Sequence, residues 1–599
     1  MSSTPAPPMG APLRIEPVGG LGQMGHHHMV VDNGPDSFLV DCGILFPPPS
    51  DPGIDRILPS FEPALQRAKE GRLRGLLLTH GHLDHLGAVP DLLAALPGLP
   101  VYATPWTMTL LRRRFDRDAP KGSAPLERRL VHPGETITVG ETELTWLRVT
   151  HSLPEACSLA MRGPGGTVVH SGDFRMQVDP LLGPPTDAAG LKAIGDGGVD
   201  LALVDSTSGA KPGRTLPERD VVARLTEVAE KATGAVIVTT FSSHVERMLG
   251  CLQVARATGR RFAIYGRSAE ETARAAIEAG LLPVRSGELL SIDAIEETPK
   301  SKLLVLVTGS QGEWRAPLAR IARGEDSRLT LGKGDMVIWS ARVIPGGERT
   351  VGGLVNRFAE AGVTVVPPWG EGSHGLHTSG HGHSDEVGEW LDLVQPRFVL
   401  PIHGEPWHLI QHQSALARRV GPERLLSLRT GQTLELDVST DVVTHGEAKT
   451  TQQWVAYGGA VFPARDPALS TRRKAGQSGA ATVVVPWRDG RVAGTPVVHA
   501  LGLVAVVETS SLERRLGLTM HRKLSLWDPI DDEGEASEKA RLTLRSIVRR
   551  EVGSKPPCLA RLLHLDGMVS YAELDAHQPD GTRDGANGNP TSEGQDPPE

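Results

Sequence analysis

The sequence contains little cysteine. Its 599 residues include four cysteines, at positions 42, 157, 251 and 558, and no two of them form a CxxC pair. Four scattered thiols exclude a disulfide framework, and the missing CxxC spacing argues against a zinc knuckle. A chain of this length can bury large cores without covalent cross-links. The cysteine content therefore fits a reducing cytoplasm.

Long apolar runs and a basic net charge are also missing. No run of about 20 apolar residues, as a membrane span needs, occurs in the sequence, and the start MSSTPAPPMGAP does not resemble a signal peptide. We therefore expect a cytoplasmic protein with no membrane segment. With 63 Lys and Arg against 71 Asp and Glu, the net charge is −8. This charge argues against nucleic-acid binding over the whole surface, but it allows a locally basic cleft.

The pattern of apolar residues changes along the chain. From 13 to 212, short apolar runs such as SFLVDCG and LRGLLLTH end in polar or histidine-rich segments, as buried strands with functional loops do. From 213 to 369, apolar strands alternate with helical stretches near Val245–Ala257, Ala269–Glu278 and Leu354–Glu360, which indicates a parallel sheet. From 370 to 440 the histidine-rich loops return. We interpret the middle region as an insertion into the first domain.

The rest of the chain is divided by composition. We expect a linker over 441–462 and a small α+β domain over 463–570, with the strand ATVVVPW and a helix near Ala536–Glu551. The ends, 1–12 and 571–599, are rich in small and polar residues and are expected to be disordered.

The strongest functional signal is the segment THGHLDHLG at 79–87, which directly follows an apolar strand. His80, His82, Asp84 and His85 place three imidazoles and a carboxylate within six residues, and zinc prefers such ligands. One turn cannot wrap a single ion with all four side chains. We therefore expect two adjacent metal sites, with His80 and His82 on one and Asp84 and His85 on the other. A polar surface loop is the less favoured alternative.

Three further candidate ligands stand at the ends of apolar strands. His151, Asp173 and His403 follow LTWLRVT, TVV and RFVLPI respectively. Each alone would more often be structural, but together with the first cluster they indicate the remaining ligands of two ions. The run His26–His28 is different, because consecutive residues of a strand point to alternate faces. We interpret these three histidines as non-ligands.

The order of these motifs carries a family resemblance. HxHxDH, then His, then GD, resembles the metallo-β-lactamase superfamily, and the insertion with a late HGE segment resembles its β-CASP nucleases, ribonuclease J in particular. Similar segments recur in order: GGLGQMG (19–25), DCGILFP (41–47), GIDRILP (53–59), THGHLDHLGAVP (79–90), THSLPEA (150–156), HSGDF (170–174), VDSTSGAKPG (204–213), TTFSSHVER (239–247), GRSAE (266–270), VTGSQGE (307–313), IPGGE (344–348), HTSGHGHSDE (377–386) and LPIHGE (400–405).

The resemblance implies an α/β fold with a known domain plan. The plan is a metallo-β-lactamase αββα sandwich made of 13–212 and 370–440, an inserted β-CASP parallel α/β domain at 213–369, and a small α+β C-terminal domain. It also implies two Zn²⁺ ions, with Mn²⁺ or Mg²⁺ as alternatives. One ion would take His80, His82 and His151, the other Asp84, His85 and His403, and Asp173 would bridge them. Asp41 would support the metal loop without binding metal.

The implied activity is hydrolysis of RNA phosphodiester bonds in RNA maturation and decay. The resemblance implies a 5′-to-3′ exonuclease and leaves endonuclease action open. Two metal ions would activate a water and stabilise charge on the phosphate, which makes Asp84 part of the catalytic set. His381 would protonate the leaving oxygen, and Asp205 would orient His381. The family also implies a homodimer or tetramer and partners in RNA-degradation complexes.

A preference for an RNA end with a 5′-monophosphate needs a pocket of hydroxyls, imidazoles and backbone N–H groups in a glycine-rich turn. The turn at 377–381 looks suited to this, and the family places a second contributor at 243–245. The candidate residues are Ser243, His244, Val245, His377, Thr378, Ser379, Gly380 and His381. The family usually has Asn where His244 stands, which leaves the preference for one 5′ group over another open.

Three other functions fit part of the pattern. A hydrolase of small esters, lactones or thioesters could use the same core, because a fold does not determine its substrate, but the insertion and the HTSGH turn argue against it. A non-catalytic RNA-binding subunit would have lost metal ligands, and none is lost here. A DNA-directed β-CASP nuclease is disfavoured by the match to ribonuclease J, although contacts to the RNA 2′-OH cannot be read from a sequence.

Overall fold

The computed structural model describes residues 12–48, 51, 53–344, 346–449, 451–457 and 460–565. The expected disordered ends lie outside these residues, apart from Pro12. The chain divides into two compact units, Met1–Pro48 with Gly53–Ala464 and Pro49–Pro52 with Arg465–Glu599.

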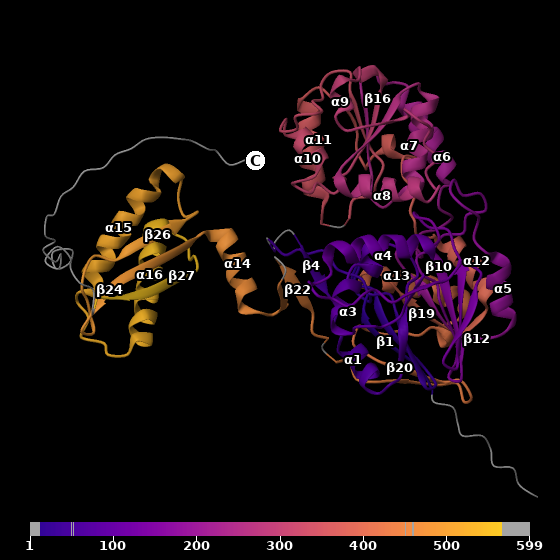
Figure 1. The fold of residues 1–599 in the computed structure, drawn as a ribbon, viewed down its shortest axis with the longest axis horizontal. Coiled ribbons are helices and arrows are strands. Elements are labelled where there is room, and N and C mark those ends of the chain that lie inside the picture. The colour runs from indigo at the N-terminus through magenta and orange to yellow at the C-terminus, as the bar shows by residue number, and fades with distance from the viewer. Residues whose placement is uncertain are drawn as a thin grey trace, which may run out of the picture. The chain divides into compact units, whose positions relative to one another are not determined.

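Two β-sheets face each other in the larger unit (Figure 1). The first contains, in order, β21 (Val442–His445), β20 (Leu434–Asp437), β1 (Leu13–Gly19), β2 (His28–Asn33), β3 (Asp36–Val40), β5 (Leu73–Leu77), β6 (Val101–Ala103) and β7 (Arg128–Leu130). The second contains β19 (Pro396–Ile402), β12 (Val199–Asp205), β11 (Gly166–His170), β10 (Cys157–Gly163), β9 (Thr142–Arg148) and β8 (Thr136–Val139).

Alternating side chains build the layers of this sandwich. Along β2, Met29 and Val31 pack between the sheets, whereas Val30 packs against the helices outside the first sheet. Those helices include α1 (Glu62–Lys69), α2 (Leu83–Leu86), α3 (Val89–Ala95) and α4 (Pro105–Asp118). The second sheet is covered by α5 (Ala188–Asp196), α12 (Ser384–Val394) and α13 (Pro406–Val420). The expected αββα sandwich is confirmed.

The strands that carry the candidate ligands end at one edge of the sandwich. β11 pairs in parallel with β12, and β12 with β19, while β9 has the same direction because both β9 and β11 pair antiparallel to β10. In the other sheet β3 and β5 are parallel. β2 is antiparallel to β3, so β2 begins where β3 ends. The residues after these parallel strands and before β2 therefore gather together.

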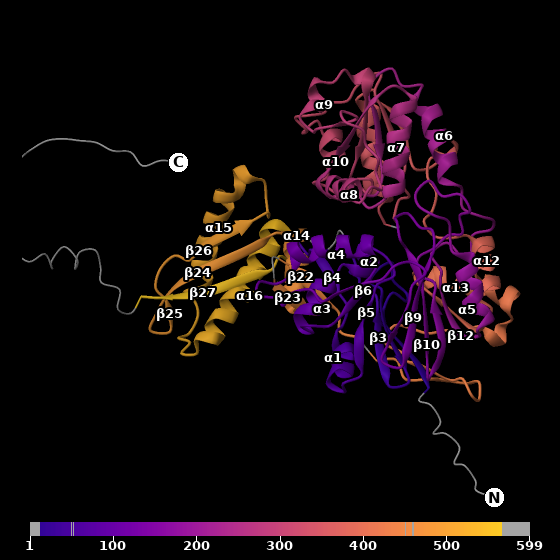
Figure 2. The same ribbon diagram turned by 45° about the vertical axis from the view of Figure 1, so that its right-hand side comes forward.

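The insertion is a parallel six-stranded sheet with helices on both faces (Figure 2). Its strands, in order, are β15 (Leu289–Leu290), β14 (Arg261–Tyr265), β16 (Leu303–Val307), β13 (Val236–Thr239), β17 (Met336–Trp339) and β18 (Thr364–Val366). One face packs on α6 (Glu218–Ala229), α7 (Val245–Ala257) and α8 (Arg267–Glu278), the other on α9 (Ala294–Glu297), α10 (Pro317–Ala322) and α11 (Glu348–Glu360). The sequence LLVLV of β16 is buried throughout, as a central parallel strand must be.

The smaller unit is an α+β domain. Its central strand β24 (Ala480–Arg488) pairs with β25 (Arg491–Val492), β26 (Val497–Leu501) and β27 (Cys558–His564). One face of this sheet packs on α15 (Val506–Leu524) and α16 (Glu533–Val552), and α14 (Pro467–Ser478) precedes the sheet. The expected helix near 536–551 corresponds to α16.

The segment expected as a linker contains ordered strands. β21 extends the first sheet, and β22 (Trp454–Tyr457) pairs with both β23 (Ala460–Pro463) and β4 (Arg56–Leu58). The cause is a pairing partner about 400 residues earlier in the sequence, which local composition cannot reveal. Among the helices in the described part of the chain, none has the length and apolar character needed to cross a membrane.

Candidate metal centre

All seven candidate metal ligands meet at the edge where these strands end. His80, His82, Asp84 and His85 lie in the loop after β5 and in α2, His151 follows β9, Asp173 follows β11, and His403 follows β19. Four strands far apart in the sequence thus deliver their following residues to a single cluster.

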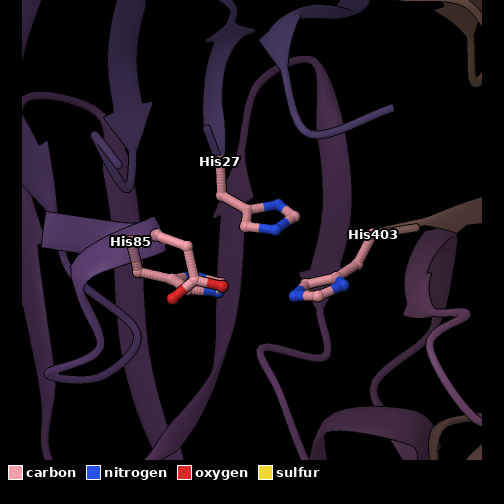
Figure 3. Close-up of side chains that lie close together, drawn as sticks. His27, His85 and His403 are labelled. Carbon is pink, nitrogen blue, oxygen red and sulfur yellow. The ribbon is translucent and has the colours of Figure 1, made fainter. Parts of the chain in front are cut away.

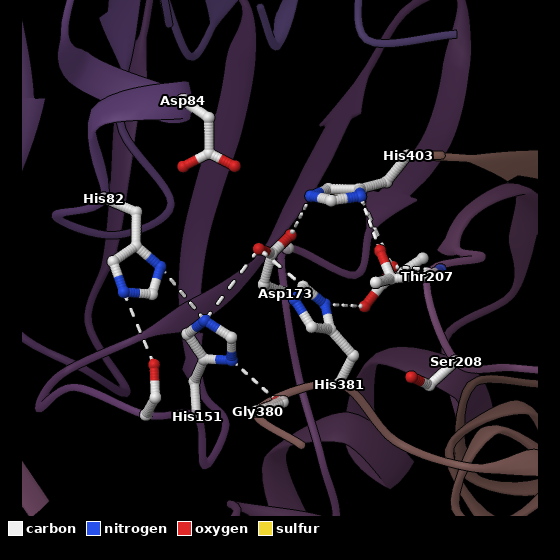
Figure 4. Close-up of polar contacts among 12 residues, drawn as sticks. His82, Asp84, His151, Asp173, Thr207, Ser208, Gly380, His381 and His403 are labelled. Carbon is white, nitrogen blue, oxygen red and sulfur yellow. Dashed lines mark hydrogen bonds and ion pairs between the residues drawn. The ribbon is translucent and has the colours of Figure 1, made fainter. Parts of the chain in front are cut away.

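Asp173 lies in the middle of this cluster (Figure 4). Its Oδ2 lies 3.6 Å from His80 Nε2, 3.3 Å from His85 Nε2 and 3.9 Å from His151 Nε2. Its Oδ1 lies 3.3 Å from His403 Nε2. The carboxylate therefore faces imidazoles of both expected sites, which is the position that a bridging ligand needs.

The first group consists of His80, His82, His151 and Asp173, whose ligand atoms all lie within 4.8 Å of one another. His82 Nδ1 lies 3.1 Å from His80 Nε2 and 3.2 Å from His151 Nε2. His151 Nδ1 donates to the Gly380 carbonyl at 2.7 Å, which leaves Nε2 for a metal. A Cβ at residue 380 would stand 2.8 Å from that Nδ1, so this contact needs glycine.

The second group contains one residue that we did not expect. His27 lies with Asp84, His85 and His403, and the four ligand atoms are within 4.8 Å of one another. Our interpretation of all three histidines at 26–28 as non-ligands assumed one continuous strand, but β2 begins at His28, and His26 has φ 68°. The alternation rule therefore does not apply before His28. Burial, then His403 and His85, lower the pKa of His27 well below its usual value.

Asp41 supports the metal loop in the way that the resemblance implied. Its Oδ2 accepts from His85 Nδ1 at 2.7 Å and from the Thr79 hydroxyl at 2.8 Å, and its Oδ1 accepts from the Thr79 amide at 2.9 Å. The Thr79 hydroxyl in turn lies 2.9 Å from His80 Nδ1. These contacts fix the orientation of two candidate ligand rings.

His381 and Asp205 form a pair beside Asp173. His381 Nδ1 lies 2.7 Å from Asp205 Oδ2, and His381 Nδ1 lies 3.9 Å from Asp173 Oδ2. Burial alone would lower the pKa of His381, but the carboxylates of Asp205 and Asp173 outweigh it and raise the pKa to about 9. His381 is therefore protonated at neutral pH.

Burial keeps the three histidines of the first group neutral. It lowers the pKa of His80 and His151 well below their usual values and that of His82 to about 4. A neutral imidazole is the form that binds a metal ion.

Carboxylates in and around the second group create an environment that favours a cation. Burial would lower the pKa of His85, but Asp173, Asp41 and Asp84 raise it well above its usual value. Within the described residues, the buried Nε2 atoms of His27, His85 and His403 make no hydrogen bond. Nitrogen and carboxylate donors of this kind suit Zn²⁺ or another divalent transition metal, so the residues fit the metal ions that the motif implies.

Three known family models match the chain in the order of this architecture. "Beta-lactamase superfamily domain" matches residues 44–212, "Ribonuclease J, beta-CASP domain" matches 233–358, and "Zn-dependent metallo-hydrolase RNA specificity domain" matches 373–424. Ribonuclease J of Mycolicibacterium smegmatis is 36% identical over 438 residues, which cover 72% of this chain and 76% of that protein.

The chain belongs to the ribonuclease J family. It is a hydrolytic ribonuclease on a metallo-β-lactamase fold. Ribonuclease J of Corynebacterium glutamicum is 33% identical over 497 residues, covering 82% of this chain and 67% of that protein. A crystal structure titled as a protein of unknown function from Enterococcus faecalis V583 shares the fold, with a TM-score of 0.51 and 17% identity over 71% of this chain and 100% of that one.

The residues expected to bind the 5′ end of the RNA lie at the N-terminus of α7 and in the turn before α12. His244 caps α7, where its Nδ1 accepts from the Arg247 amide at 3.2 Å, and Ser243 and Val245 flank it. The Thr378 hydroxyl donates to the Leu216 carbonyl at 2.9 Å. The Ser379 hydroxyl accepts from the His381 amide at 3.0 Å.

Two histidines of this region are neutral, and of these His244 is buried and His377 is half-buried. Burial lowers the pKa of His377 to about 3 and the pKa of His244 well below its usual value, and nearby Arg247 and Arg175 lower both further. His377 Nδ1 has no hydrogen-bond partner among the described residues. The 377–381 turn therefore contains an unpartnered polar atom. The turn lies close to the metal centre, because Gly380 contacts His151 directly.

Sequence reasoning missed the charged residues beneath this pocket. Arg247 pairs with Glu218 across α6 and α7, and Arg175 pairs with Glu246. All four side chains are buried. A lone arginine or glutamate in an amphipathic stretch gives no sign of such pairing, so only Glu246 and Arg247, inside the quoted TTFSSHVER segment, were within reach.

Proposed function

We propose that the chain is a two-metal ribonuclease that cuts RNA from the 5′ end toward the 3′ end and that also cuts internally, in RNA maturation and decay in the cytoplasm. The observation that carries this proposal is the convergence of two ligand groups on Asp173, with the His381–Asp205 pair directly beside them. The two ions are Zn²⁺ in this proposal, and Mn²⁺ or Mg²⁺ are the alternatives that metal analysis separates.

When bound, two such ions supply an activated water and stabilise negative charge on the phosphate. His80, His82 and His151 would hold one ion and Asp84, His85 and His403 the other, with Asp173 between them. Hydrolysis adds water to phosphorus and breaks its bond to the 3′ oxygen, which needs a proton. His381, protonated and held by Asp205, donates that proton.

The polar groups around His244 and the 377–381 turn support recognition of a 5′-monophosphate. His377 offers an unpartnered ring nitrogen, and the first turn of α7 offers backbone N–H groups at the positive end of a helix. The buried arginines there are paired with carboxylates. We therefore assign phosphate binding to neutral donors at Ser243, His244, Val245 and the 377–381 turn.

We also propose that the protein assembles as a homodimer or tetramer through the C-terminal sheet. The face of this sheet away from α15 and α16 exposes Val497, Leu501, Leu559 and Leu563. Exposed apolar patches of this kind mark contact surfaces.

The decisive test uses one RNA with either a 5′-monophosphate or a 5′-triphosphate, labelled at its 5′ end. We expect rapid release of labelled mononucleotide from the monophosphate RNA, and loss of this release with a chelator or in the double variant Asp84→Ala/His85→Ala. Internal fragments alone would contradict the exonuclease assignment. Absence of metal-dependent cleavage of both RNAs would overturn the proposed function and direct attention to lactone and thioester substrates.

A further inference from the structure

His27 is buried at the metal centre but has no hydrogen-bonding role for its ring. The residue is 8% exposed, and its Nε2 makes no hydrogen bond within the described part of the chain. Its ring stacks with those of His85 and His403, at centroid distances of 4.4 Å and 3.8 Å (Figure 3). A polar atom buried without a partner costs free energy unless a ligand binds it.

The backbone holds His27 against the metal loop. Its amide donates to the Asp84 carbonyl at 2.9 Å, and its carbonyl accepts from the Gly43 amide at 2.8 Å. These two bonds connect the start of β2 to α2 and to the segment after β3. The position of His27 relative to Asp84 and His85 is therefore fixed by main-chain contacts.

The environment of the ring directs Nε2 toward the centre. Gly20 has φ 85°, and a Cβ there would stand 2.5 Å from His27 Nδ1. The glycine therefore makes room for the Nδ1 side of the ring. The Nε2 atoms of His26 and His28 are also buried without a hydrogen-bond partner among the described residues. These two histidines differ from His27 in another way, because His28 Nδ1 is bonded to the Asp41 carbonyl at 2.8 Å and neither belongs to a ligand group among the described residues.

We propose that His27 is a ligand of the second metal ion, through Nε2, together with Asp84, His85 and His403. This inference rests on the proposed two-ion site. It gives that ion four side chains in addition to the shared Asp173. Five protein ligands exceed the four of a tetrahedral zinc site, so the second ion would be five- or six-coordinate.

The test measures metal binding in three variants of the full chain. His27→Asn removes the ring, His27→Phe keeps a stacking ring without nitrogen, and His26→Asn makes the matched change one residue earlier. Metal content after dialysis and competition with a chelator give the number and affinity of the ions. Thermal melting of each metal-free variant reports folding.

We expect two ions per chain in the wild type and in His26→Asn. Both His27 variants should keep one tight ion and bind the second more weakly by more than about 100-fold, the upper end of what loss of an outer partner costs. Unchanged affinity for the second ion in either His27 variant would overturn the inference. Unchanged affinity in His27→Phe would show that the ring of His27 serves for stacking alone. Fewer than two ions in the wild type would overturn the two-ion site itself, and with it this inference.

The wild type provides a second readout that needs no variant. With Co²⁺ in both sites, the visible absorption should contain the weak bands of a five- or six-coordinate ion. Strong tetrahedral bands from both ions would contradict a ligand role for His27. If the protein with these two tetrahedral ions still cleaves RNA, the proposed function stands without this role of His27.

Discussion

At the scale of single residues, the centre depends on how carboxylates set the protonation of neighbouring imidazoles. Asp173 faces five imidazoles, and Asp205 faces one of them, that of His381, at 2.7 Å. Burial alone would raise the pKa of Asp173, but His403 and His85 lower it well below its usual value. The carboxylate therefore remains ionised and available for cations at neutral pH.

The pKa of His381, about 9, predicts an alkaline limit to activity. A raised pKa keeps the imidazole protonated below about pH 9, so cleavage that needs this acid persists there and declines as the pH rises through about 9. Asp205→Asn removes the carboxylate that raises the pKa most. We expect the alkaline limb of kcat/KM to move to lower pH, with a rate loss of about 100-fold to 10,000-fold.

The matched control for this prediction is Asp200→Asn. Asp200 lies on the same strand, β12, and its carboxylate pairs with Arg397 at 2.9 Å on the surface. This control should keep the wild-type pH profile. An Asp205→Asn variant whose alkaline limb does not move would contradict the role of Asp205 in holding the proton on His381.

At the scale of elements, a buried ion pair joins two helices of the insertion beneath the pocket. Arg247 on α7 pairs with Glu218 on α6 and donates to the Ser340 carbonyl at 2.9 Å and the Leu376 carbonyl at 3.3 Å. The guanidinium thus connects α6, the end of β17 and the start of the turn at 377–381.

Arg247→Met should destabilise the protein strongly, because it leaves the buried Glu218 carboxylate without its partner. We expect the free energy of unfolding to fall by about 3–5 kcal/mol, measured by denaturant unfolding. The control Arg256→Met, on the same helix, removes a surface pair with Glu288 and should cost less than about 1 kcal/mol. Equal losses in the two variants would contradict the structural role of the buried pair.

The same pair makes part of the stability depend on pH. Burial alone would raise the pKa of Glu218, but Arg247 lowers it below 4.5. A lowered folded-state pKa gives stability that is fully present above pH 4.5 and is lost as the pH falls through the lowered value. The difference in the free energy of unfolding between wild type and Arg247→Met should therefore become smaller at acidic pH.

At the scale of the whole molecule, the C-terminal sheet has one covered face and one exposed face. Val483, Val485 and Ala560 pack against α15 and α16, whereas Leu501 is 76% exposed and Leu559 46% exposed on the other face. Burying such apolar area in a symmetric contact would stabilise a dimer by about 25 cal/mol per Å² before the costs of association.

Leu501→Lys combined with Leu559→Lys should convert the proposed dimer or tetramer into a smaller species. Light scattering after gel filtration gives the mass. The control Leu526→Lys changes a leucine that is 86% exposed but lies between α15 and α16, outside the sheet. A wild-type monomer, or an unchanged mass in the double variant, would contradict assembly through this face.

The amino-acid sequence alone indicated the parallel insertion and the seven residues of the expected metal site, and its resemblance to ribonuclease J implied the sandwich. It could do so because apolar strands followed by His or Asp are local patterns, and because parallel strands bring their carboxyl ends to one edge. A helix was also predicted near Val245–Ala257, where the structure has α7.

Only the tertiary structure showed that His27 joins the second metal group. Because β2 is antiparallel to β3, the first residues of β2 reach the edge where β3 and β5 end. No local sequence pattern predicts that pairing. The pairing of β22 with β4 and the buried Arg247–Glu218 contact were hidden for the same reason. Each depends on which distant segments pack together, and long-range packing is decided by the whole chain and not by neighbouring residues.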